Sequence, residues 1–531
     1  MIIRFIRFVS LSLLTFFAAL STAQAAAPDP YSLAERLDER LEAKQAANGV
    51  KPAPLIDDSG FLRRVSLDLI GRIPTSYEVY TFLADTSPDK RRRVVDKLLR
   101  SPGYVTHHVN LWRALLLPET MTNAEMRFLQ PGFDAWLRQK VRDNTPYDRL
   151  AYELIAAPIA AANNPQQQAL APNDPRPNPL AFFAAKEGKP ENIAAASSRV
   201  FLGVQIECAQ CHNHPFAKWS REQFWGMAAF FGGIEQRGDN GAFTPVREIV
   251  DRRELAIPNT DRVVQATFLD EREPEWKFKT SARVTLAEWM IRPDNPWFAR
   301  NAANRALAQF LGRGIVEPVD DFNDKNPPSH PELLNELAEA FVAAKFDVQF
   351  LVRAITATRA YQRSSELTDP GQGDGRLFAR MAIKGMSGEQ LFDSLVVATG
   401  YRAAGSRDQS DPNGGSPERS LFLDRFALQG KKTDPQTSIL QALSLMNGRF
   451  VADAATLQRS ETLAAVAGVP LLSPVERIEA LYVATLSRKP TPEETRRMSQ
   501  YVETGGEGKL NQRLSDVMWV LLNSAEFRLN H

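Results

Sequence analysis

The chain has 531 residues, of which 44% are hydrophobic and 24% are charged. These values are ordinary for a globular protein, and the length is enough for several domains. Because 64 Lys and Arg residues balance 63 Asp and Glu residues, the net charge is only +1 and gives no electrostatic basis for nucleic-acid binding. We therefore expect no nucleic-acid partner.

Residues 1–25 have the pattern of a secretory signal peptide. Arg4 and Arg7 provide the positive start, and Phe8 to Leu20 form a short apolar centre. Ala23-Gln24-Ala25 provides the small residues of a cleavage site. The apolar centre is short for a membrane span and nothing comparable follows, so no integral membrane segment is expected after cleavage. The sequence therefore predicts a periplasmic or extracellular protein.

Apolar residues recur at helical spacing after the signal, in stretches 32–47, 56–71, 77–84 and 89–99. This pattern continues up to the segment around residue 230 and predicts a helical domain over residues 26–236. Pro190 suits the first position of a helix. Val200, Val204, Cys208 and Cys211 follow it at spacings of three and four residues. We therefore expect both sulfurs on the buried stripe of that helix.

The two cysteines of the chain both lie in Cys208-Ala209-Gln210-Cys211-His212. The C-x-x-C-H spacing is typical of covalent c-type haem attachment. Two thiols three positions apart reach the two vinyl groups of one porphyrin, and the adjacent imidazole then lies beneath the iron. The motif predicts haem c bound by Cys208 and Cys211, with His212 as the proximal ligand, and hence electron transfer.

Two other uses of these residues remain open. Cys208, Cys211, His212 and His214 together supply two thiolates and two imidazoles, which are ligands for zinc or another non-haem metal. The two cysteines alone also suit a disulfide, which the oxidising environment of an exported protein permits. Under either alternative the chain is an exported binding or scaffold protein.

A haem iron has a second face, and three residues are candidates to bind it. His107 and His108 precede the motif, and Met227 follows it in a segment rich in aromatic residues. Each also has a simpler interpretation, because a histidine can be satisfied by hydrogen bonds and methionine is a common filler of core gaps.

Residues 237–282 differ in sequence pattern from the helical stretches on either side. Glycine-rich turns separate short runs of β-branched and aromatic residues at Val246–Val250, Val263–Phe268 and Trp276–Phe278. Helical periodicity then resumes at Val284 and continues toward the end of the chain. The predicted fold is mainly α, with a small β-rich connector over 237–282 between the first helical domain and a second one over 283–531.

The second domain contains a cluster of acidic residues and a histidine: Asp320, Asp321, Asp324 and His330. Such a set is compatible with general acid–base or metal-assisted hydrolysis, so a hydrolase is a further alternative. Ser329 and Glu332 have the spacing of a capping box and predict that the next helix begins after Ser329. Capping does not account for the aspartates.

Several short motifs resemble a planctomycete-specific cytochrome-like family of unknown function, fused to its planctomycete-specific partner domain. In the first domain the matching stretches are Phe61–Pro74 and Cys208–Phe216, and in the second they are Asn295–Arg300, Ser329–Leu334 and Asn523–Phe527. The resemblance covers nearly the whole chain after the signal and implies a cytochrome-like role. Longer relatives often carry a separate cytochrome domain, whereas this chain has a single C-x-x-C-H. Electron transfer therefore implies a redox partner protein.

Overall fold

The computed structural model describes residues 28–159, 172–236, 241–401, 417–426, 448–504 and 507–531. The predicted signal peptide, residues 1–25, lies outside the described residues. Helices form most of the described chain, and its strands pair as short two-stranded antiparallel sheets, so the predicted mainly α fold is confirmed. Within these ranges, no helix is both long enough and apolar enough to span a bilayer.

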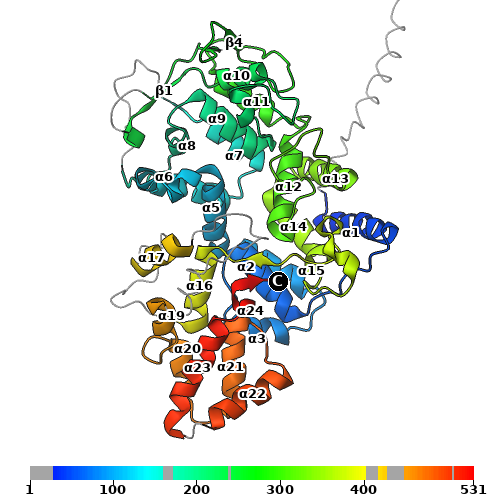
Figure 1. The fold of residues 1–531 in the computed structure, drawn as a ribbon, viewed down its shortest axis with the longest axis vertical. Helices are drawn as coiled ribbons and strands as arrows, with labels where there is room; N and C mark the ends of the chain where they lie inside the picture. Colours follow the sequence, from blue (N-terminus) through cyan, green and yellow to red (C-terminus); the bar gives the residue numbers. More distant parts are fainter. Residues whose placement is uncertain (1–27, 160–171, 237–240, 402–416, 427–447, 505–506) are drawn as a thin grey trace, which may run out of the picture.

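The helix α2 occupies the middle of the molecule (Figure 1). It begins after Asp57, whose carboxylate accepts a hydrogen bond from the Gly60 amide at 2.8 Å. It ends at Gly71, which has a left-handed conformation with a φ of +70°. The helices of this N-terminal part are α1 (Pro30–Ala47), α2 (Asp58–Ile70), α3 (Ser76–Ala84), α4 (Lys90–Leu99), α5 (Pro102–Leu116), α6 (Ala124–Arg142) and α7 (Tyr147–Ile155).

The region around the C-x-x-C-H motif is built from shorter elements. They are α8 (Ala181–Ala185), α9 (Pro190–Ser197), the π-helical turn η2 (Ser198–Leu202), the 3-10 turn η3 (Glu207–Gln210) and α10 (Arg221–Ala229). Two hairpins follow, in which β1 (Ile234–Gln236) pairs with β2 (Val246–Glu248) and β3 (Glu254–Ala256) pairs with β4 (Val263–Gln265). The predicted strands near 246 and 263 are thus present but shorter, whereas Trp276–Phe278 forms no strand.

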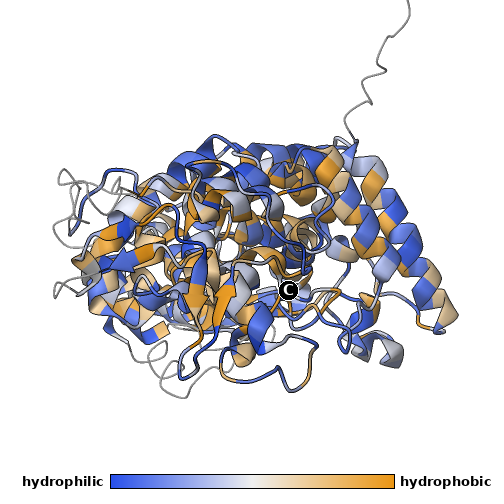
Figure 2. Cartoon of the chain, turned by 90° about the horizontal axis from the view of Figure 1, so that it is seen from above, coloured by the Kyte–Doolittle hydropathy of each residue, from blue (hydrophilic) through white to orange (hydrophobic). Residues whose placement is uncertain are grey.

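The larger hydrophobic core contains residues from both predicted domains. Phe61 of α2 and Phe201 of η2 belong to it, together with Phe298 and Phe341 from beyond residue 283, and all four side chains are at most 1% exposed. Hydrophobic and hydrophilic residues alternate along the helices in Figure 2, as amphipathic packing requires. The later helices that contribute are α11 (Ala282–Met290), α12 (Phe298–Leu311), α13 (Pro331–Ala343), α14 (Val348–Ala357) and α15 (Arg359–Gln362).

A second core lies in the C-terminal part, at the lower end of the molecule in Figure 1. It also includes Leu67 of α2 and Ile73, so α2 contributes to both cores. The helices there are α16 (Gly388–Thr399), α17 (Pro417–Phe426), α19 (Arg449–Ala454), α20 (Glu461–Gly468), α21 (Pro474–Leu486), α22 (Pro492–Glu503), α23 (Leu510–Leu522) and α24 (Ala525–Arg528).

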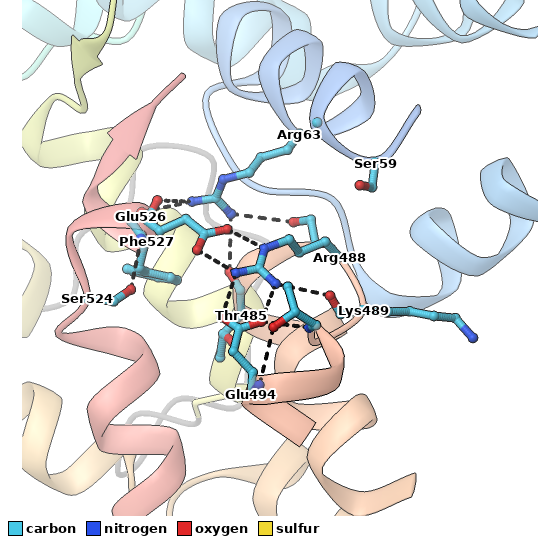
Figure 3. A network of polar contacts seen from close by, with 12 residues as sticks. Ser59, Arg63, Thr485, Arg488, Lys489, Glu494, Ser524, Glu526 and Phe527 are labelled. Carbon is cyan, nitrogen blue, oxygen red and sulfur yellow. Dashed lines mark hydrogen bonds and ion pairs between the residues drawn. The ribbon is translucent and has the colours of Figure 1, made fainter. Parts of the chain in front are cut away.

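Buried charged residues of α2 connect it to the end of the chain. Arg63 donates to the backbone carbonyls of Thr485, Glu526 and Phe527 at 2.9 to 3.1 Å. Next to it, Arg488 bridges the carboxylates of Glu494 and Glu526 at 2.8 and 2.6 Å (Figure 3). The three carbonyls give both terminal nitrogens of the buried Arg63 guanidinium hydrogen-bond partners in place of water.

Asp68 lies one turn further along α2 and is 6% exposed. It accepts hydrogen bonds from Lys384 at 2.7 Å, from the Tyr361 hydroxyl at 2.9 Å and from Asn530 at 2.8 Å. Lys384 and Asn530 belong to the paired strands β5 (Lys384–Gly385) and β6 (Leu529–Asn530). One carboxylate therefore connects α2 with a strand pair formed by two distant segments.

We predict that Asp68→Asn lowers the free energy of unfolding by about 3 kcal/mol, because it removes the carboxylate that faces the buried Lys384 ammonium. Urea denaturation measures this change. Asp89→Asn is a matched control, since Asp89 is exposed and makes no capping hydrogen bond; it is expected to cost less than about 0.5 kcal/mol. Equal effects of the two substitutions would contradict the prediction.

Candidate functional site

The helix that leads to the motif ends earlier than the sequence pattern predicts. α9 continues into the π-helical turn η2, and regular geometry stops at Gly203, which has a φ of +69°. A Cβ atom at this position would lie 2.6 Å from Oδ1 of Asn301, so only glycine fits there. The predicted helical stripe through Val204 to Cys211 is therefore wrong.

The two cysteines lie on an exposed turn instead of a buried helix face. Cys208 is within η3, Cys211 follows its last residue, and both are exposed free thiols. Ala209 between them is fully buried and faces the core. The two exposed thiols are thus three positions apart in sequence, one within the turn and one directly after it. The prediction of buried sulfurs is wrong, because this turn directs Ala209 inward.

Residues of α10 support the turn from its inner side. The Trp225 indole donates to the carbonyl of Gln210 at 3.0 Å, and the Arg221 guanidinium donates to the same carbonyl at 3.3 Å. The backbone amide of Arg221 also donates to Oδ1 of Asn213 at 2.9 Å. Ser220 and Gln223 form a capping box at the start of this helix. The turn that carries the cysteines is thus fixed to a well-defined helix.

The two histidines of the motif region present different ring nitrogens. Nδ1 of the exposed His212 lies 2.7 Å from the carbonyl oxygen of Asn213, a contact that requires Nδ1 to carry the proton. In the neutral ring with this tautomer, Nε2 carries a lone pair. A histidine that binds a metal through Nε2 typically donates its other ring proton to a backbone carbonyl in this way.

His214 has the opposite arrangement. Its Nδ1 accepts hydrogen bonds from the backbone amides of Ala217 at 2.9 Å and Phe216 at 3.2 Å. The neutral ring therefore carries its proton on Nε2, and neither nitrogen presents a lone pair for a metal. Among the residues that the structure describes, no three His, Cys, Asp or Glu side chains gather as metal ligands. His214 thus acts as a local support of the loop.

The candidates for the second face of an iron lie in the protein interior. Met227 in α10 is fully buried within the larger core, whereas His212 is exposed. His107 and His108 in α5 are 6% and 5% exposed, and Nδ1 of His108 lies 3.1 Å from the carbonyl of Tyr104. A Cβ atom on Gly71 would lie 2.5 Å from Nδ1 of His107, so this ring fills space beside α2.

Each aspartate of the acidic cluster has its own partner. Asp320 forms an ion pair with Arg199 at 2.5 Å, and Asp321 accepts a hydrogen bond from Asn323 at 2.7 Å. Asp324 is exposed and lies 3.5 Å from Lys218. Burial alone would raise the pKa of Asp320, but the hydrogen bond and charge of Arg199 hold that pKa below its ordinary value.

His330 belongs to the loop before α13 and is 4% exposed. Its Nδ1 lies 3.1 Å from the Ser329 hydroxyl, and its ring contacts the ring of Phe378. The predicted capping box is wrong, because Ser329 directs its hydroxyl to the carbonyl of Ile315 at 3.1 Å and α13 begins without a side-chain cap. Burial and the nearby Lys44 ammonium lower the pKa of His330 to about 4.

We predict a pH-dependent contribution of His330 to stability. Its pKa in the folded state, about 4, is below the ordinary value of 6.5, so between these values the unfolded chain binds more protons and stability falls as the pH is lowered. Replacement by asparagine is expected to remove about 2 to 3 kcal/mol of this loss. Urea denaturation of wild type and His330→Asn between pH 4 and pH 7 measures the difference; parallel curves would contradict it.

The fold and the motif first define a class: a mainly helical protein that presents one C-x-x-C-H sequence on an exposed turn. Residues 36–236 match the family PSCyt2, described as a protein of unknown function (DUF1549). Residues 282–420 and 422–502 match the family PSD1, also described as a protein of unknown function (DUF1553). The chain thus belongs to these families, with an N-terminal PSCyt2 region and a C-terminal PSD1 region, and the predicted resemblance is confirmed. No curated protein and no solved structure matches it.

The sequence pattern singles out the thiols and His212 as candidates, but it does not indicate most of the residues that contact this turn in the structure. Trp225 and Arg221 are close to the motif in sequence, and the aromatic crowding around Trp225 was a usable signal. Asn301 and Asp320 lie about 100 residues away, and single-sequence patterns carry no information on such pairings.

Proposed function

We propose that the protein is an exported, c-type cytochrome-like electron-transfer protein with one haem. Cys208 and Cys211 hold the group through thioether bonds, and His212 is its proximal ligand. The observation that carries this proposal is the contact from Nδ1 of His212 to the carbonyl of Asn213, next to the two exposed thiols of Cys208 and Cys211. This donor set fits the haem of a C-x-x-C-H site.

Each residue has a defined role in this proposal. Cys208 and Cys211 would hold the group covalently through thioether bonds, which would prevent its dissociation. The hydrogen bond to Asn213 orients the His212 ring and raises the basicity of Nε2. When bound, haem supplies one-electron redox chemistry. Because the turn is exposed, a redox partner protein can approach it closely.

The alternatives differ in how much support they have. A structural zinc site needs His214 as a fourth ligand, and the hydrogen bonds that Nδ1 of His214 accepts oppose that role. A disulfide between Cys208 and Cys211 needs no further ligand and remains the second candidate, since both thiols are exposed and free. The hydrolase alternative has no specific support, because the aspartates are engaged by neighbouring side chains.

The first test is expression of the full chain together with a c-type haem maturation system. We expect a Soret band and a covalent mass increase equal to one haem, and both are expected to vanish in the Cys208→Ala, Cys211→Ala double variant. These thiols are exposed, so the variant should stay folded, which circular dichroism can verify. Colourless wild-type protein with free thiols, a disulfide or bound zinc would overturn the proposal.

The second test uses the two histidines as a matched pair. We expect His212→Ala to lose the proximal ligand and to change the spin-state bands of the haem spectrum, because no imidazole then follows Cys211. His214→Ala is expected to keep the wild-type spectrum, since His214 presents no free lone pair. The opposite result, with His214 as the sensitive residue, would show that the ligand assignment is wrong.

A further inference from the structure

The backbone that leads to the cysteines is bound by residues of the PSD1 region. The side chain of Asn301 donates to the carbonyl of Val200 at 2.7 Å, and Arg305 donates to the carbonyl of Arg199 at 2.7 Å. Both residues are on α12. These carbonyls belong to the end of a helical segment, where backbone acceptors lack partners within the helix. The PSD1 region thus completes the end of the motif-bearing segment.

Asp320 makes the most direct connection. Its Oδ2 accepts from Arg199 at 2.5 Å, and its Oδ1 accepts from the side-chain amide of Gln205 at 2.8 Å. Two residues further on, the amide of Phe322 donates to the carbonyl of Gly203 at 2.9 Å. One short loop of the PSD1 region therefore binds the chain on both sides of the left-handed Gly203, and Gln205, one of the residues it binds, is three positions before Cys208.

The chain after the motif also contacts the PSD1 region. Trp219, which is 3% exposed, packs its ring against Trp297 with centroids 6.2 Å apart. The backbone carbonyl of Trp219 in turn accepts from the amide of His214 at 2.8 Å. The loop that carries the thiols and His212 is therefore supported at both ends by residues beyond 282.

We infer that Asp320 is a positioning residue for the haem ligands, and that the PSD1 region is for this reason an integral part of the site in the PSCyt2 region. This inference rests on the proposed function. Asp320 touches neither the thiols nor His212; it acts through Arg199 and Gln205. With both side chains bound to one carboxylate, the segment from Gly203 to Cys208 has a single arrangement. The spacing of the two sulfurs and the direction of His212 depend on that arrangement.

The inference predicts a local effect in the protein without haem. Asp320→Asn keeps the size of the side chain but removes the ion pair to Arg199. We expect hydrogen exchange at the amides of Val204, Ala209 and Phe322 to accelerate at least about tenfold, because these amides donate within the supported segment. Asp324→Asn is the matched control from the same loop, and its exchange should stay within about twofold of wild type, since Asp324 is exposed and its ion pair is long.

A second measurement uses the haem-loaded protein. Asp320→Asn and Gln205→Ala are both expected to shift the reduction midpoint and to broaden the spin-state bands, because the ligand turn no longer has one arrangement. Asp320→Glu, which restores the charge, is expected to recover most of the wild-type behaviour. A residue that acts on global stability alone would change the melting temperature without changing the midpoint.

The two levels of hypothesis fail differently. If Asp320→Asn exchanges like wild type, or if exchange rises equally in the distant helix α21, the positioning role is overturned whatever the cofactor. If wild-type protein takes up no haem, the proposed function is overturned, while the exchange experiment still decides whether Asp320 fixes the cysteine turn. A fast-exchanging Asp320→Asn variant with an unchanged midpoint would also refute the inference.

Discussion

The candidate site depends on one constraint, the capture of the backbone at Arg199, Val200 and Gly203 by residues more than 100 positions later in the chain. A helix that ends in a left-handed glycine has carbonyls without intrahelical partners. These carbonyls need hydrogen-bond donors from elsewhere in the chain. Here α12 and the loop around Asp320 supply the donors. These contacts also position the exposed turn with the thiols, because only four residues separate Gly203 from Cys208.

Much of the fold could be predicted from the sequence, since helical periodicity reflects burial directly. The main wrong prediction was the apolar stripe through Val200, Val204 and Cys208. The spacing of these residues is that of a helix, but the helical segment ends at Leu202. Gly203 lies within that stretch and could have indicated the helix end, because glycine is common at the position directly after a helix. The capping box at Ser329 failed for a different reason: Ile315 competes for its hydroxyl, and tertiary contacts of this kind leave no local pattern.

The two family regions are units of sequence, whereas the hydrophobic packing crosses them. Phe298 and Phe341 of the PSD1 region share the larger core with Phe61 and Phe201 of the PSCyt2 region. The aspartates that the sequence suggested as one catalytic cluster each have a different partner in the structure. Asp320 accepts hydrogen bonds from two residues of the PSCyt2 region. The hydrolase interpretation of this cluster stays a prediction, while the structure shows that Asp320 contacts Arg199 and Gln205 of the PSCyt2 region.

The buried side chains of α2 have a consequence for how the chain reaches its folded state. Arg63 finds its acceptors at Thr485 and Phe527, and Asp68 finds Lys384 and Asn530, so α2 emerges from the ribosome more than 300 residues before its partners. Contacts between segments so far apart slow folding, because a long loop must close before they form. In the nascent chain, Arg63 and Asp68 therefore lack these hydrogen-bond partners until synthesis is nearly finished. This delay favours folding after translation over folding during translation.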